Sequence, residues 1–163
     1  VSGTNQISTD PNNTYAPGGG TSAASPGIAG ITAQLYQAYR EFNGGQNAPG
    51  ALLKAVLLNT AEDLGNRGPD YTYGFGRVNA YRALKALEQR TYIDSFLVQG
   101  DSINHSIVVP AGTRQVKLMC YWPDTAGVGN AAKACHIKRL RCSGRGQVKG
   151  TSVEASQNIL TSM

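Results

Sequence analysis

A glycine-rich run that leads into a helical pattern is the feature that most constrains the fold of this chain. Residues 18–26 read Gly-Gly-Gly-Thr-Ser-Ala-Ala-Ser-Pro, and apolar residues then recur at spacings of three and four: Ile28, Ile31, Leu35 and Tyr39. This periodicity predicts a helix from Ser22 to about Arg40 with one buried face. Glycines permit a tight turn, and a helix N-terminus offers free N–H groups to a developing negative charge. The pattern therefore predicts one serine, Ser22, at the mouth of a helix.

Ser22 has two interpretations. Serine often caps a helix, and glycine before a helix is ordinary turn chemistry, so a structural role is the simpler interpretation of the serine taken alone. The full spelling from Gly20 to Pro26 favours a nucleophile instead. Ala24 stands where a Gly-x-Ser-x-Gly elbow has its second glycine, and the Gly-Lys-Ser/Thr ending of a phosphate loop is missing from the run. These two rival motifs are therefore excluded.

The spelling Gly-Thr-Ser-x-Ala-x-Pro resembles the nucleophile segment of the subtilisin-like serine peptidases. The resemblance continues downstream, because that family usually closes its catalytic domain with an Asn-Thr-Ala-like stretch and then Tyr-Gly-x-Gly-x-Val-Asn-Ala. This chain has Asn-Thr-Ala at 59–61 and Tyr-Gly-Phe-Gly-Arg-Val-Asn-Ala at 73–80. The resemblance implies that Ser22 is the catalytic nucleophile and that its backbone N–H is an oxyanion donor. It also implies that Gly20 and Thr21 shape the active-site loop.

The same resemblance implies that the rest of the catalytic machinery precedes Val1. In the family an aspartate, a histidine and an oxyanion asparagine come before the serine, and the histidine takes the proton of the hydroxyl. His105 and His136 both follow Ser22, in a strand pattern and in a basic tail, so we expect neither to be the base. Asn5 is not assumed to be the oxyanion asparagine. Residues 1–163 alone are therefore expected to be inactive or nearly so.

The expected fold class is α/β. By resemblance, residues 1–90 are the C-terminal portion of a subtilisin-like parallel-sheet domain whose upstream strands are missing. Within it we expect an extended segment at 7–9, a turn at 10–13, a second helix opened by Pro49 that runs through Thr60, and a third helix to about Gln89. The third helix is predicted to place four apolar residues on one side: Val78, Tyr81, Leu84 and Leu87.

After Arg90 the apolar period changes to two, which predicts strands at 92–98, 103–109 and 114–121. We interpret residues 91–134 as the start of a truncated antiparallel β-sandwich. The segments 109–112 and 121–124 resemble the opening strands of the β-sandwich modules that many secreted subtilisin-like enzymes carry.

Residues 135–163 form an atypical basic tail. Residues 1–132 contain nine basic and nine acidic side chains, whereas six of the remaining residues are basic and one, Glu154, is acidic. Two interpretations stay open. A frameshift is one, because reading residues 138–142 one base later permits codons for Asn-Asp-Leu-Asp, which such sandwiches often contain. The other is a genuine, disordered basic extension.

Other candidate sites have structural interpretations. The aromatic and glycine run at 71–76 could bind a ligand, but we favour tight turns and core packing. Asp10, Asp63 and Asp70 are expected to form caps and turns. Cys120 is expected to be a small buried hydrophobe, and the three cysteines lack zinc-site spacing. We expect no metal ligand and no cofactor for the chemistry, although members of the resembled family often bind structural calcium.

The sequence therefore favours a fragment of a serine endopeptidase that acts on protein or peptide substrates. Secretion is implied by the resemblance. The cations lack the interleaved aromatic residues that stack on bases, and no apolar run reaches the roughly 20 residues that span a bilayer, so neither nucleic acid nor a membrane is an expected partner. The alternatives are a non-catalytic interaction module with Ser22 as a relic, and an inactive gene fragment without a stable fold. The oligomeric state is left open.

Overall fold

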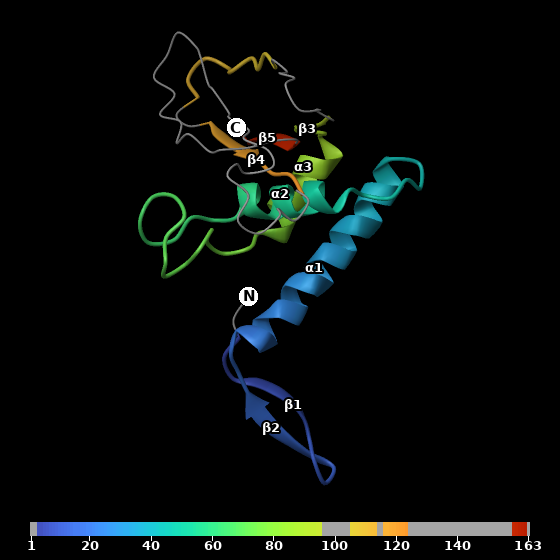
Figure 1. The fold of residues 1–163 in the computed structure, drawn as a ribbon, viewed down its shortest axis with the longest axis vertical. Coiled ribbons are helices and arrows are strands. Elements are labelled where there is room, and N and C mark those ends of the chain that lie inside the picture. The colour runs from blue at the N-terminus through green and yellow to red at the C-terminus, as the bar shows by residue number, and fades with distance from the viewer. Residues whose placement is uncertain (1–2, 96–104, 114–115, 124–157, 163) are drawn as a thin grey trace, which may run out of the picture.

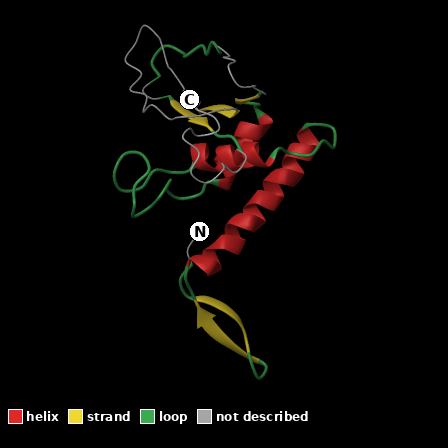
Figure 2. Cartoon of the chain, in the orientation of Figure 1, coloured by secondary structure: helices red, strands yellow, loops and turns green. Residues whose placement is uncertain are grey.

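The computed structural model describes residues 3–95, 105–113, 116–123 and 158–162. Its elements combine helices and strands, in agreement with the expected mixed class (Figures 1 and 2). In chain order they are β1 (Gln6–Asp10), β2 (Thr14–Gly18), α1 (Thr21–Phe42), α2 (Gly50–Thr60), α3 (Ala80–Glu88), β3 (Tyr92–Asp94), β4 (Lys117–Cys120) and β5 (Asn158–Ser162). All strand pairs among these elements are antiparallel, so residues 3–90 supply helices and a hairpin rather than the strands of a parallel sheet.

Strands β1 and β2 form a hairpin that extends away from the helices (Figure 1). Asp10 pairs with Thr14, and the turn between them places Asn12 and Asn13 at φ values of 64° and 62°. Asparagine tolerates this left-handed region better than most side chains do. The expected extended segment at 7–9 and the expected turn at 10–13 are therefore both confirmed.

Helix α1 is longer than the periodicity predicted, because it begins at Thr21 and ends at Phe42. Its C-terminal end is closed by the N–H of Asn43, which donates to the carbonyls of Tyr39 and Arg40, and by two glycines at positive φ that turn the chain. Only Leu35 of this helix is fully buried. Its N-terminal half therefore lies outside the hydrophobic core.

The hydrophobic core is built around α2. Leu52 and Val56 of this helix are completely buried, and so is Leu87 of α3. Helix α2 contacts α1 and α3 as well as strands β4 and β5. The second helix, expected from Pro49 through Thr60, is thus confirmed, and it supplies the centre of the core.

Helix α3 begins after Asn79, whose side-chain oxygen accepts a hydrogen bond from the N–H of Arg82 at 2.9 Å. The predicted buried side is wrong at Tyr81, which is 68% exposed. Leu87 is buried as predicted, and Ala83 and Ala86 complete the buried face at spacings of three and four. Tyr81 lies two residues before Ala83, about 200° around the helix axis, and so it points away from the core.

A polar network joins the end of α2 to the start of α3. The backbones of Glu62 and Arg77 exchange two hydrogen bonds of 2.8 Å, and the two side chains form an ion pair. Asn79 donates to the Glu62 carboxylate at 2.9 Å. Between them, Gly76 has φ 100°, and a Cβ there would lie 2.0 Å from the Glu62 carbonyl oxygen. Only glycine therefore allows the two segments to come this close.

The C-terminal strands form one sheet in the order β3-β5-β4, with antiparallel pairing throughout. Strands β3 and β4 lie within two of the predicted strands, at 92–98 and 114–121. The strand predicted at 103–109 is wrong over residues 105–109, which are irregular. No β-sandwich is seen among the described residues, and the domain boundaries and the status of the tail stay predictions. The proposed frameshift segment at 138–142 lies outside the described residues.

We predict that Leu87→Ala lowers the free energy of unfolding by about 2–5 kcal/mol, because it opens a cavity among fully buried side chains. Denaturant titration measures this change. Ile7→Ala, at an exposed position of β1, serves as the control and should stay within about 0.5 kcal/mol of the parent. Equal effects of the two substitutions would contradict the assigned core.

The Glu62 network predicts an acid-sensitive component of stability. Hydrogen bonds from Arg77 and Asn79, together with the Arg77 charge, lower the pKa of Glu62 below its usual value near 4.5. Because the pKa of Glu62 is lower in the folded than in the unfolded state, the network stabilises the folded state at pH values above the unfolded pKa. This contribution is lost as the pH falls through the folded pKa. Glu62→Gln should remove this component from a plot of the denaturation midpoint against pH. Glu88→Gln, which removes an exposed carboxylate of α3, should leave it in place.

Candidate active site

Ser22 is the second residue of α1, and it is exposed at the end of the helix remote from the core. The residue before the helix, Gly20, has φ 110° and ψ 176°. This conformation is essentially restricted to glycine. The glycine that precedes the Thr-Ser pair is therefore needed for the chain to turn into α1 at this point.

The first turn of α1 leaves two hydrogen-bond donors free. The N–H groups of Ala23 and Ala24 both donate to the Gly20 carbonyl, at 3.1 and 3.3 Å. Within the described residues, the N–H groups of Thr21 and Ser22 have no acceptor, and the Ser22 hydroxyl has no partner. Ser22 therefore does not cap its own helix, as the simpler interpretation required. Its hydroxyl lies beside free N–H groups at the positive end of the helix dipole.

A second glycine-containing segment lies against the turn. The N–H of Gly20 donates to the Gly3 carbonyl at 2.7 Å. A Cβ on Gly3 would lie 2.1 Å from the Gly20 carbonyl oxygen, and a Cβ on Gly19 would lie 2.9 Å from the Gly3 oxygen. Gly3 thus joins the predicted Gly20 and Thr21 in shaping the serine loop. Sequence reasoning missed Gly3, because its contact depends on the hairpin that brings both segments together.

The other candidate residues do not complete a catalytic site. His105 is exposed in an irregular segment, and Asn5 is exposed with φ 54°. Asp70 accepts hydrogen bonds from three backbone N–H groups, and Asp63 accepts one from the N–H of Gly68, so both shape turns as expected. In the part of the chain that the structure describes, no histidine or aspartate hydrogen-bonds to Ser22. His136 lies outside that part.

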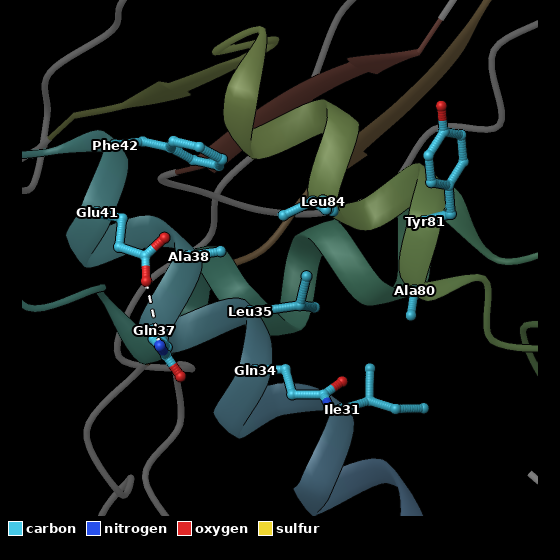
Figure 3. A pocket seen from close by; sticks show the side chains of 10 residues that line it. All are labelled: Ile31, Gln34, Leu35, Gln37, Ala38, Glu41, Phe42, Ala80, Tyr81 and Leu84. Atoms are coloured by element: carbon cyan, nitrogen blue, oxygen red, sulfur yellow. Dashed lines mark hydrogen bonds between the residues drawn. The ribbon is translucent and has the colours of Figure 1, made fainter.

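A groove on the described part of the chain lies away from Ser22. It measures about 440 Å³ and lies between the second half of α1 and the start of α3 (Figure 3). Its lining nearest to the serine is Ile31, nine residues further on, which corresponds to about 13 Å along the helix axis. The groove therefore contributes no wall around the serine hydroxyl.

The aromatic run at 71–76 departs from its predicted packing. Tyr71, Tyr73 and Phe75 are all exposed, so the expected core packing is wrong for these side chains. The expected tight turns are present, since Gly74 and Gly76 both have positive φ and Asp70 bridges to Gly74. Cys120 is buried, as predicted.

The described residues contain neither a metal-binding cluster nor a membrane-spanning helix. In residues 3–95 and the shorter described segments, histidine, cysteine and acidic side chains do not gather in threes that could hold a metal ion. Within the same residues, no helix has both the length and the apolar character that crossing a bilayer requires.

We predict that Gly20→Ala destabilises the serine loop by about 1–3 kcal/mol, because alanine is strained at φ 110°. No atom lies within 4 Å of the added methyl group, so the cost measures backbone conformation alone. Gly30→Ala is a matched control inside α1, also with open space around the methyl group, and it should be neutral or stabilising by up to about 1 kcal/mol. Denaturant titration compares the two variants, and a stable Gly20→Ala protein would contradict the assigned turn.

The chain is similar in sequence to known proteins. Residues 1–76 match the model of the subtilase family. Two extracellular serine proteases of Serratia marcescens are 27% and 30% identical to the chain over 129 residues. Each match covers 79% of this chain and 11% of the relative's length. The matched segment contains the free helix N-terminus, Ser22 and the loop through Gly76. Residues 1–76 are therefore similar to the subtilase family, and the comparisons support a subtilisin-like serine peptidase.

Proposed function

We propose that this chain supplies the serine-bearing part of a subtilisin-like endopeptidase, with Ser22 as the nucleophile. The observation that carries the proposal is the position of Ser22 at the start of α1, where it is exposed and where, among the described residues, neither its hydroxyl nor the first N–H groups of the helix have a partner. In the proposed reaction, Ser22 Oγ attacks the carbonyl carbon of a peptide bond and a base accepts its proton. The negative charge that develops on the carbonyl oxygen is stabilised by donors aimed at it.

The residues of this chain divide the work in this proposal. The Ser22 N–H provides one oxyanion donor, and Gly20 and Thr21 shape the approach of the substrate. The base, the aspartate that orients it and the asparagine donor come from residues that precede Val1. A serine without a base is weakly nucleophilic at neutral pH, so residues 1–163 by themselves would have little activity.

The same proposal covers the wider protein. Residues 1–90 would complete a parallel-sheet catalytic domain, and residues 91–134 would begin an appended β-sandwich. The curated relatives are named as extracellular serine proteases, which supports secretion and a protein or peptide substrate. Because the match spans 11% of their length, activity, location and substrate are proposed for a longer protein that contains this chain.

We predict that Ser22→Ala, in a protein that also contains the residues preceding Val1, lowers kcat by about 10⁴-fold or more with little change in stability. Hydrolysis of a fluorogenic peptide measures kcat. Ser25→Ala is the matched control, because it removes an equally exposed hydroxyl one turn further along the same helix. Its kcat should stay within about tenfold of the parent.

Two outcomes would count against the proposed nucleophile. One is full peptidase activity in Ser22→Ala, which would move the reacting group elsewhere. The other is complete inactivity of the longer parent protein while it is folded, which would favour the interaction-module alternative with Ser22 as a relic.

A further inference from the structure

We propose that residues 117–121 dock onto α2 and make the C-terminal strands and the helices a single cooperative folding unit. The proposal is independent of the catalytic role of Ser22. Both sides of the contact belong to this chain: residues 117–121 on one side, and on the other the face of α2 that is turned toward β4 and β5. The helical part would then depend on strands that lie beyond residue 90 for its own stability.

Apolar packing is the first observation. Met119 and Tyr121 pack against the buried cluster that contains Leu52 and Val56, and Cys120 between them is 7% exposed. Six of the eleven residues of helix α2 are buried, four of them apolar, and β4 and β5 contact this helix in addition to α1 and α3. Apolar burial is the largest favourable contribution to folding, so removing the strands would expose the second face of this helix to water.

Two lysine side chains make contacts across the same interface, one from each side. Lys117 Nζ of β4 lies 3.4 Å from both the Leu58 and the Ala61 carbonyl oxygens, at the C-terminal end of α2. Helix α2 has no basic residue in its own last turn, so Lys117 supplies the cation that the negative end of the helix dipole favours. In return, Lys54 Nζ of α2 lies 4.7 Å from the centre of the Tyr121 ring.

The Lys117 contact carries a cost in hydration. Burial lowers the pKa of Lys117, because its charged form loses hydration in the folded state. Asp63 opposes this shift and Arg82 adds to it. We therefore expect the apolar packing of Met119 and Tyr121 to supply most of the stability of the docked segment.

The other edge of the sheet is tied to α1. The Arg90 guanidinium donates to the Phe42 carbonyl at 3.0 Å, and the rings of Tyr39 and Tyr92 are 6.4 Å apart. Strands β3 and β4 lie on either side of β5 in one sheet, and β5 also contacts α2. Helices and sheet are therefore joined at both edges and at the centre, as expected of a single unit.

The single tryptophan of the chain, Trp122, makes a direct test available, because it follows the docking segment immediately. Denaturant unfolding of residues 1–163 is followed by Trp122 fluorescence, which reports the strands, and by far-ultraviolet circular dichroism, which reports the helices. We expect the two transitions to coincide. Two separate midpoints would overturn the proposal, because strands and helices would then unfold independently.

A pair of tyrosine variants supplies the second arm. Tyr121→Ala should lower both midpoints together and raise the hydrogen-exchange rates of α2 amides by about tenfold or more. Tyr81→Ala is the matched control, since Tyr81 also lies under a lysine, Lys85 at 5.8 Å, but on the exposed side of α3. It should leave both probes nearly unchanged. A Tyr121→Ala protein in which fluorescence shifts and α2 exchange does not would overturn the proposal without reference to catalysis.

Discussion

The burial of α2 is the constraint on which the rest of the structure depends. Helices α1 and α3 contact this helix, and so do β4 and β5, which places the apolar cluster at the junction of segments far apart in sequence. The polar groups around it follow from that arrangement. Glu62, just after the helix, pairs with Arg77 ahead of α3, while Lys117 reaches the carbonyls at its C-terminal end. Each connection orients an element whose stability comes from the shared core.

The candidate active site, in contrast, lies outside the hydrophobic core. Helix α1 is about 33 Å long, and its C-terminal half enters the core while Ser22 stands exposed at the other end (Figure 1). Local backbone geometry shapes the serine loop, through Gly20 at φ 110° and its hydrogen bond to Gly3. This division leaves Ser22 exposed at the end of a helix whose buried part is remote from it. Among the described residues, no side chain of the turn caps the first N–H groups of the helix.

The helices could be predicted from sequence because their apolar periodicity is strong and their ends carry clear signals. Pro49 precedes α2 as expected, and the expected turn at 10–13 rested on Asp-Pro-Asn-Asn, whereas the capping of α3 by Asn79 required the structure. Tyr81 was misplaced because two faces of α3 carry apolar side chains, and only packing against α1 and α2 decides which face is buried. Irregular residues 105–109 alternate like a strand, yet strand formation requires a partner that periodicity alone does not reveal.

For the candidate site, the sequence predicted Ser22, Gly20 and Thr21, whose roles stay predictions, but the contact with Gly3 and the exposure of the aromatic run required the structure. Gly3 contributes through its backbone, which no side-chain motif marks. Tyr71, Tyr73 and Phe75 read as core residues by type, and their exposure reflects the sharp turns that Gly74 and Gly76 impose. Composition could not foresee the docking of residues 117–121 either, since it depends on tertiary packing between segments that lie far apart in sequence, 59 residues in the case of Leu58 and Lys117.

The most direct measurement is the site of covalent modification by a serine-reactive phosphonate in a protein that contains this chain and the residues preceding Val1. Such a reagent reacts with an activated hydroxyl and leaves an adduct that peptide mapping by mass spectrometry can locate. We expect one adduct, on the peptide that contains Ser22, and none after prior denaturation of the protein. An adduct on another residue, or an active peptidase that leaves Ser22 unmodified, would contradict the assignment of Ser22 as the nucleophile.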